Sequence, residues 1–361
     1  MNFLRRLASL KVTLLGMALL AAGAMAIYGN PAQIPAWVLT VPLMVLALNL
    51  TAAIITNVRI NQQPGLLVFH VCLLALVILA GVGRLTYLDS HVELPIGTRF
   101  DAAEMLDTRT GIFHQGNIDK VAFTQGEFSV EYSPGIQRGR TYSHVQLREA
   151  SGRWVEQVIG DDSPLLSHGY RFYTTHNKGF TVVLHWMPDN GTPRLGTINM
   201  PSFPLFDYKQ DNRWTPPESK KEIKFWLQLT TAMDVSKSWV LSHRNSSGVL
   251  VVTHRGQRTE LGLGQSVDLG DGVLRFERLS MWMGYRIFYD PTIHWMFFIS
   301  IAGVLGLGQY FWKKINLQPW MEAESSEGSD VTDAENTDEA NGSVKNGSVK
   351  TATLPTKRGV V

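Results

Sequence analysis

Residues 64–83 read PGLLVFHVCLLALVILAGVG, an apolar stretch that contains one histidine, His70. A bilayer core is about 30 Å thick, so this length and composition predict a membrane-spanning helix. An ionisable imidazole inside hydrocarbon costs free energy unless it has a partner, which makes His70 a candidate functional residue. Imidazole is a common axial ligand of haem iron. The alternative interpretation is a histidine that only hydrogen-bonds to a neighbouring helix.

Apolar residues make up 45% of the 361 residues and concentrate in four stretches. We therefore expect a membrane protein that combines α-helices with an all-β part: three N-terminal transmembrane helices, one C-terminal transmembrane helix and a large β-rich domain between them. The expected spans are residues 12–29, 36–56, 66–87 and 292–312. Ala24-Met25-Ala26 resembles a signal-peptide cleavage site, but the second span follows so closely that we expect the first to be retained.

Basic residues flank the spans unevenly. Arg5, Arg6 and Lys11 precede the first span, and Lys313 and Lys314 follow the fourth. Cytoplasmic loops retain Lys and Arg, so both termini are expected in the cytoplasm. The domain is then expected outside the cytoplasm, which in a bacterium is the periplasmic side of the inner membrane. The expected parts are a basic N-terminus (1–11), an extracytoplasmic domain (88–291) and a disordered acidic tail (313–361).

The segment between the third and fourth spans has the pattern of β-strands. Apolar and polar residues alternate in 128–132, 144–148 and 250–254, and turn signals such as Asn177-Lys178-Gly179 separate such runs. About ten to twelve short strands are expected, forming a sandwich or open barrel. A Pro-rich stretch, 201–217, is expected to divide them into two groups joined by an irregular loop.

Charge and cysteine content exclude several classes of function. The chain has 33 Lys and Arg against 31 Asp and Glu, without the basic excess that nucleic-acid binding requires. The chain has one cysteine, Cys72, which can form no disulfide within the chain. Because a second cysteine is absent, haem cannot be attached covalently through a Cys-x-x-Cys-His motif. We interpret Cys72 as a small buried apolar residue. No catalytic residues are predicted.

The remaining histidines are weaker candidates than His70. Those of the outer domain lack the spacing of zinc ligands and are interpreted as structural or surface residues: His91, His114, His144, His168, His176, His185, His243 and His254. His294 begins the fourth span at the outer interface. His70 is expected near the cytoplasmic face of the membrane and His294 near the outer face, on the order of 20 Å apart. The two therefore cannot bind the same iron atom. A second ligand for a haem on His70 would come from another polypeptide.

Together, the topology and four local motifs resemble a known family. The motifs are LASLK (7–11), GLLVFH (65–70), HGYRFY (168–173) and GYRIFYDP (284–291). In this order, with three spans before the β-rich domain and one after it, they resemble the ResB (CcsB) family of cytochrome c biogenesis proteins.

This resemblance implies a role in the system II pathway, in which a ResC/CcsA-type membrane partner cooperates in moving haem and attaching it to apocytochrome c. It implies that His70 is an intramembrane ligand of haem b, transported or transiently bound. The chain would then be a subunit of a cytochrome c synthase (haem lyase) complex and not catalytic alone. One alternative is a membrane-tethered extracytoplasmic assembly or binding module without cofactor. A haem b electron-transfer subunit is less favoured, because only one histidine lies at that depth.

Overall fold

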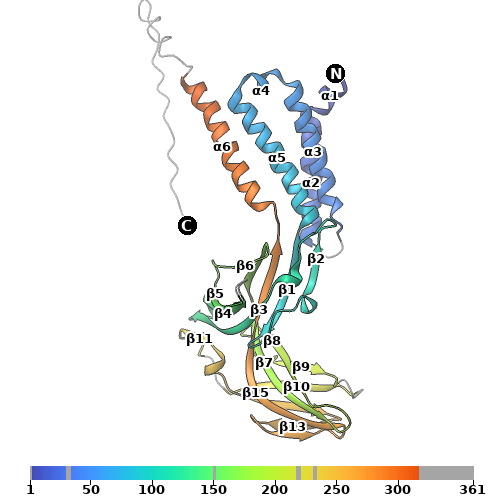
Figure 1. The fold of residues 1–361 in the computed structure, drawn as a ribbon, viewed down its shortest axis with the longest axis vertical. Helices are drawn as coiled ribbons and strands as arrows, with labels where there is room; N and C mark the ends of the chain where they lie inside the picture. Colours follow the sequence, from blue (N-terminus) through green and yellow to red (C-terminus); the bar gives the residue numbers. More distant parts are fainter. Residues whose placement is uncertain (1, 30–33, 149–151, 217–220, 231–233, 317–361) are drawn as a thin grey trace, which may run out of the picture. The chain divides into compact units, whose positions relative to one another are not determined.

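The computed structural model describes residues 2–29, 34–148, 152–216, 221–230 and 234–316. The expected tail lies outside these residues from 317 onward, as does most of the loop after the first span. Five helices precede the strands and one follows them (Figure 1): α1 (Asn2–Leu7), α2 (Leu10–Gly29), α3 (Trp37–Thr56), α4 (Val58–Gln62), α5 (Pro64–Thr86) and α6 (Ile293–Asn316).

Four of these helices, α2, α3, α5 and α6, are long and apolar enough to cross a membrane. Most of their apolar surface points away from the rest of the protein, as expected for helices whose solvent is lipid. The helices begin and end within a few residues of the expected spans. Pro64 is the first residue of α5, where the missing N–H costs nothing because a helix has no internal acceptor for it there.

A buried polar residue joins the first helices. Asn49 of α3 is 5% exposed and donates a hydrogen bond to the main-chain oxygen of Leu7, at 2.6 Å. Its side-chain oxygen accepts one from the Thr13 hydroxyl, at 2.8 Å. Such bonds between helices satisfy polar groups that lipid cannot.

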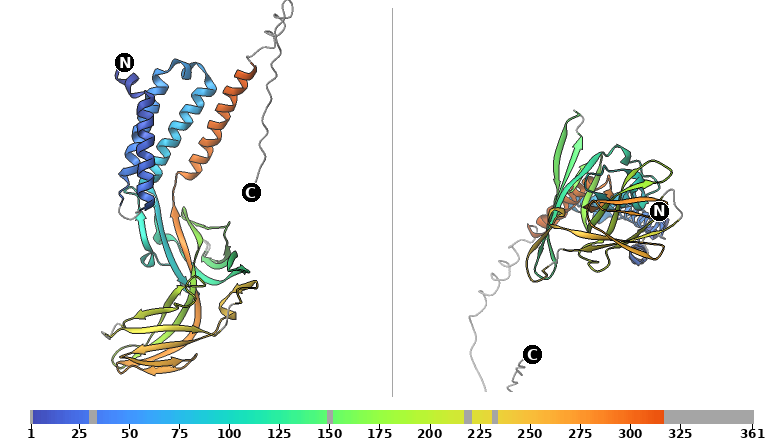
Figure 2. Two further views of the ribbon diagram at one scale, coloured as in Figure 1. Left: turned by 180° about the vertical axis from the view of Figure 1, so that it is seen from behind. Right: turned by 90° about the horizontal axis from the view of Figure 1, so that it is seen from below.

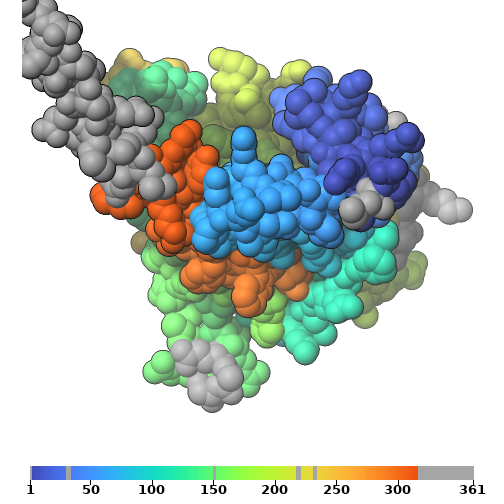
Figure 3. All heavy atoms as spheres, turned by 90° about the horizontal axis from the view of Figure 1, so that it is seen from above, coloured from blue at the N-terminus to red at the C-terminus, as the bar shows by residue number. Residues whose placement is uncertain are grey.

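Helices α5 and α6 meet through glycines. A Cβ atom on Gly65 would lie 2.5 Å from the Gly306 main-chain oxygen, and a Cβ atom on Gly306 would lie 2.8 Å from a methyl carbon of Val68. Small residues allow helix backbones to approach this closely in a membrane. Atoms of α6 (orange) lie directly beside those of α5 (blue) in Figure 3.

Residues 88–289 form an antiparallel β region. Its strands are β1 (Leu88–Pro95), β2 (Leu106–Thr110), β3 (Phe123–Ser133), β4 (Gln137–Arg148), β5 (Trp154–Ile159), β6 (Leu165–Ser167), β7 (Tyr170–Pro188), β8 (Arg194–Ser202), β9 (Asp211–Trp214), β10 (Ile223–Leu229), β11 (Trp239–Leu241), β12 (Gly248–His254), β13 (Gln257–Leu261), β14 (Ser266–Asp268) and β15 (Gly272–Tyr289).

These strands form three sheets. The largest has the order β2-β1-β15-β7-β6, with β14 also paired to β15 and β8 to β7. The other two have the orders β13-β12-β10-β9 and β11-β3-β4-β5. In the largest sheet, β1 continues directly from α5, and β15 leads into α6 (Figure 2). The paired strands β1 and β15 are therefore the two covalent connections between the membrane helices and the β region.

One apolar core lies between the sheets, and Tyr285 links two of them inside it. This β15 residue is fully buried, and its hydroxyl donates to Oε1 of Gln125 at 2.7 Å and lies 2.5 Å from the Ser143 hydroxyl. Burial raises the pKa of Tyr285, so the phenol stays protonated and remains a donor.

The membrane-plus-β fold class and its four spans are confirmed, and the alternating segments 128–132, 144–148 and 250–254 all lie in strands. The expected number of strands is too low. The predicted division at 201–217 is wrong, because β11 and β15 follow it in sequence but pair with strands that precede it.

The predicted turn at Asn177-Lys178-Gly179 is also wrong, because these residues lie inside β7. The register between β7 and β15 shifts beside them, so the chain bulges within the strand. A β-bulge leaves an extra residue unpaired in the ladder, as a turn does at the end of a strand. Gly284 faces the bulge, where a Cβ atom would lie 2.6 Å from the Asn177 main-chain oxygen.

Candidate functional site

His70 lies in the second turn of α5 and is half-buried. Its Nδ1 atom is 2.7 Å from the main-chain oxygen of Leu66. A carbonyl oxygen only accepts, so Nδ1 carries a proton, and in the neutral imidazole Nε2 then keeps its lone pair. The edge-on ring of Phe69, with centroids 5.4 Å apart, restricts the imidazole further. Histidines that bind metals are commonly held in this way through their other nitrogen.

The face of α5 that carries His70 differs from the face that contacts α6. Gly65, Val68 and Cys72 meet α6, at Gly306 and Gly303. At 100° per residue, His70 lies nearly opposite them on the helix. Cys72 thus points away from His70, as its spacing predicts, and it packs as a small apolar residue beside Gly303.

An apolar groove of about 370 Å³ lies between α3 and α5. Val77 and Gly81 line it from α5, with Thr40, Met44 and Ala47 among the lining residues of α3. Residues seven and eleven positions after His70 return to its face of the helix, so His70 continues the α5 side of this groove toward the start of α5.

His294 lies at a different level from His70. It is an exposed residue in the first turn of α6. Helices α5 and α6 run antiparallel, since Gly65 faces Gly306 whereas Gly83 faces Asp290 and Thr292. The 13 residues from His70 to Gly83 span about 20 Å at 1.5 Å per residue. The two imidazoles therefore cannot bind one iron atom.

Two histidines of the β region have surroundings that their sequence did not reveal. His114 Nδ1 donates to the main-chain oxygen of Thr86 at 2.9 Å, and its Nε2 lies 3.0 Å from the Tyr170 hydroxyl. It thus joins the end of α5 to β7. His254 is 9% exposed, and neither of its ring nitrogens has a hydrogen-bond partner among the residues that the structure describes. Only long-range contacts create these settings, and spacing in the sequence carries no signal of them.

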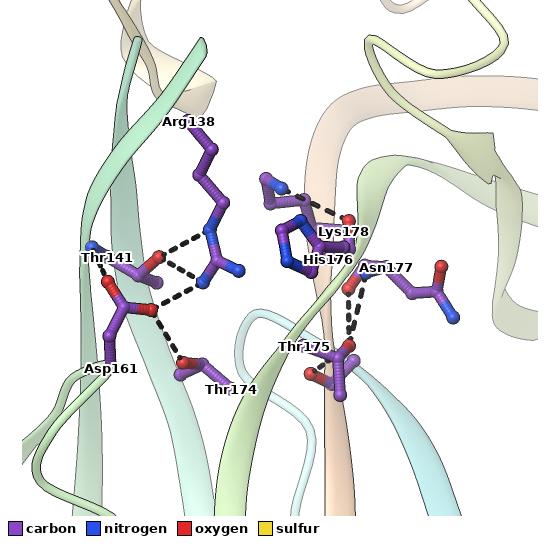
Figure 4. A network of polar contacts seen from close by, with 9 residues as sticks. Arg138, Thr141, Asp161, Thr174, Thr175, His176, Asn177 and Lys178 are labelled. Atoms are coloured by element: carbon purple, nitrogen blue, oxygen red, sulfur yellow. Dashed lines mark hydrogen bonds and ion pairs between the residues drawn. The ribbon is translucent and has the colours of Figure 1, made fainter. Parts of the chain in front are cut away.

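A cluster of basic side chains surrounds the bulge of β7 (Figure 4). Lys178 is 2% exposed, and its Nζ donates to the main-chain oxygen of His176 at 3.1 Å and lies 5.5 Å from the centre of the Tyr132 ring. Burial, and then the nearby Arg138, lower the pKa of Lys178 to about 8. Burial also lowers the pKa of His176. Lys178 did not stand out in the sequence, because its triplet has the composition of an exposed turn.

One carboxylate partly balances this cluster. Asp161 accepts from Arg138 Nη2 at 2.6 Å and from the main-chain N–H of Thr141 at 3.1 Å. Arg138 also donates to the Thr141 hydroxyl at 2.6 Å. These contacts tie the β4 strand to the loop after β5. Within the described ranges, no three His, Cys, Asp or Glu side chains gather as a metal site.

The fold and the site define a multi-pass membrane protein with a long antiparallel β region between its third and fourth spans, and one histidine held inside the third span. Residues 61–212 match the model of the ResB-like family. The resemblance to this family in the sequence motifs is thus confirmed over a stretch that begins in α4, includes His70 and ends in β9.

Among solved structures, the chain matches one titled "Cytochrome c Heme Lyase CcmF" at 11% identity, with a TM-score of 0.26. The match covers 84% of this chain and 35% of that one, so the chain spans about a third of the length of that protein. At this TM-score the match transfers neither a detailed fold nor a function. No curated protein matches the chain. The family match supports a role in cytochrome c biogenesis.

Proposed function

We propose that this chain is a haem-handling subunit of a membrane complex that attaches haem to apocytochrome c, acting with a ResC/CcsA-type partner as part of system II. The observation that carries the proposal is the setting of His70. The residue lies in a membrane-crossing helix, its Nδ1 bonds to Leu66, and its Nε2 is left with a free lone pair. The family match includes this residue.

His70 suits haem b as a transported substrate. A neutral imidazole ligates iron through the nitrogen that carries no proton, and the Leu66 carbonyl fixes which nitrogen that is. Haem is amphipathic, and the apolar groove of α3 and α5 offers a surface for its hydrocarbon part. Because His294 lies near the other end of the spans, the second axial position is assigned to the partner.

The flanking charges support an orientation in the bacterial inner membrane. Arg5 and Arg6 lie in α1, and Lys313 and Lys314 lie in the last turns of α6. We place α1 and the end of α6, which carry these residues, in the cytoplasm. The β region then lies on the periplasmic side. His70 then lies in the cytoplasmic half of its span, where it can receive haem made inside the cell.

Co-expression tests this function. A host without its own maturation system would express an apocytochrome with this chain, with a ResC/CcsA-type protein, or with both, and covalent haem would be detected by haem staining. We expect attachment only when both are present. Attachment by this chain alone would contradict the subunit role. If the two proteins together attach haem to the apocytochrome but their purified complex contains no haem, the alternative is favoured, an assembly module without cofactor.

A further inference from the structure

Two strongly exposed apolar side chains lie beside the end of α5. Ile112 is 74% exposed and Phe113 is 58% exposed, and both lie in the turn of residues 111–114, which we call the interface turn. A single exposed apolar residue is ordinary on a protein surface, but two adjacent large ones cost free energy if water covers them. Their position relative to the membrane helix decides what covers them.

The main chain of the interface turn is bonded to the last residues of α5. The Phe113 N–H donates to the Leu85 main-chain oxygen at 2.8 Å, and the Gly111 N–H donates to that of Tyr87 at 2.8 Å. The last carbonyl groups of a helix have no N–H partner within the helix, and the interface turn supplies such partners at the end of α5. A Cβ atom on Gly111 would overlap the Leu85 carbonyl, which shows how closely the turn is seated.

This bonding fixes the depth of Ile112 and Phe113. Leu85 belongs to the span that ends at Thr86, so the turn lies level with the last turn of a membrane-crossing helix. Neighbouring side chains are of the kind found where a bilayer meets water. The Arg84 guanidinium lies 4.6 Å from the centre of the Tyr87 ring, and tyrosine and arginine both place an apolar body in lipid and a polar end in water.

We infer that the interface turn is a lipid-binding anchor: Ile112 and Phe113 insert into the boundary between headgroups and acyl chains and hold the β region against the bilayer surface. The lipid surface is the occupant that the structure favours, because the turn is bonded to the last residues of a span whose side chains mostly face away from the rest of the protein. The helices α5 and α6 already connect the β region to the membrane through β1 and β15, and the turn adds a contact beside β2.

Depth can be measured with a nitroxide label. Cys72 is the only cysteine, so Cys72→Ala, which keeps the Cβ atom that contacts Gly303, provides a background for single labelling sites. Ile112→Cys and Phe113→Cys are the test sites. The full chain would be reconstituted into phosphatidylcholine vesicles, and collisions of each label with oxygen, which concentrates in hydrocarbon, would be compared with collisions with a water-soluble nickel chelate.

Two exposed residues provide matched controls. Val304, in the middle of α6, is 69% exposed and reports lipid, and Tyr208, between β8 and β9, is 88% exposed and reports water. We expect the ratio of oxygen to nickel collisions at 112 and 113 to approach that of Val304→Cys and to exceed that of Tyr208→Cys several-fold. A ratio equal to that of Tyr208→Cys would overturn the inference and favour a protein partner. Low collision rates with both reagents would overturn it too, since the side chains would then be packed inside the chain.

Discussion

Gly65 of α5 and Gly306 of α6 lie so close that neither position has space for a larger side chain. The nearest atoms to a Cβ atom on Gly65 belong to the backbone of α6, at Gly306 and Tyr310, so the helices would have to separate to accommodate it. This crossing sets where α6 lies relative to the helix that carries His70.

Substitution Gly65→Val should therefore disrupt the pairing of α5 and α6. A crosslink can detect this, because a Cβ atom on Gly303 would lie 3.1 Å from that of Cys72, slightly closer than the roughly 3.5 to 4.5 Å typical of disulfides. We expect Gly303→Cys to form a disulfide with Cys72 under oxidation, and Gly65→Val to remove most of it. Gly81→Val is the matched control, since nothing lies within 4 Å of a Cβ atom there. Undiminished crosslinking in Gly65→Val would refute the crossing.

Substitution His70→Ala should remove haem from the purified complex of this chain with its partner. Losing a residue that merely orients a metal ligand costs about 10- to 100-fold in affinity, so losing the ligand itself should lower haem occupancy at least tenfold. Added imidazole should restore part of it. Absorption spectra at matched protein concentration provide the measurement, with His294→Ala as the control that keeps its haem. If His70→Ala and wild type hold equal haem, His70 is not a ligand.

Buried Lys178 should make the stability of the β region rise with pH above 8, until the opposite effect of Tyr285, whose pKa burial raises, sets in near pH 10. The pKa of Lys178 is about 8 in the folded protein, whereas an unperturbed lysine has a pKa of 10.5. Between these two values the lysine binds more protons in the unfolded chain, so its contribution to the free energy of unfolding increases with pH, by no more than about 3 kcal/mol at 1.36 kcal/mol per pKa unit. Below pH 8 the lysine is charged in both states, and this contribution is constant.

The measurement is urea unfolding of the detergent-solubilised chain, followed by tryptophan fluorescence at several pH values. Lys178→Met should abolish the rise, because it removes the buried charge. The control is Lys237→Met, since the Lys237 side chain is 77% exposed and pairs with Asp234 at the surface. A pH dependence that survives in Lys178→Met would assign it to another group.

Reporter fusions test the proposed orientation. After Lys314, only a reporter that works in the cytoplasm should be active. At Asn190-Gly191, in the loop between β7 and β8, only a reporter that works in the periplasm should be active. Alkaline phosphatase and green fluorescent protein, which are active on opposite sides of the membrane, provide complementary readouts at both sites. The reverse pattern at both sites would invert the proposed topology.

The sequence by itself determined the membrane spans and several of the strands. Long apolar runs and two-residue alternation are local properties, and each is set by the solvent that a short segment must face. His70 was identifiable for the same reason, since a titratable residue in the 64–86 span is anomalous whatever surrounds it. Pairing of β11 and β15 with earlier strands was not identifiable, because strand partners far apart in sequence leave no local pattern.

Only the tertiary structure decided the settings of individual side chains. The Asn177-Lys178-Gly179 triplet has the composition of a turn, yet pairing of β7 with β15 holds it inside a strand and buries Lys178. The hydrogen bond from His70 to Leu66 selects a nitrogen, and the bonds of the interface turn to Leu85 and Tyr87 set its depth. Burial, protonation and depth depend on atoms that only folding brings together, whereas residue type and spacing are present in the unfolded chain.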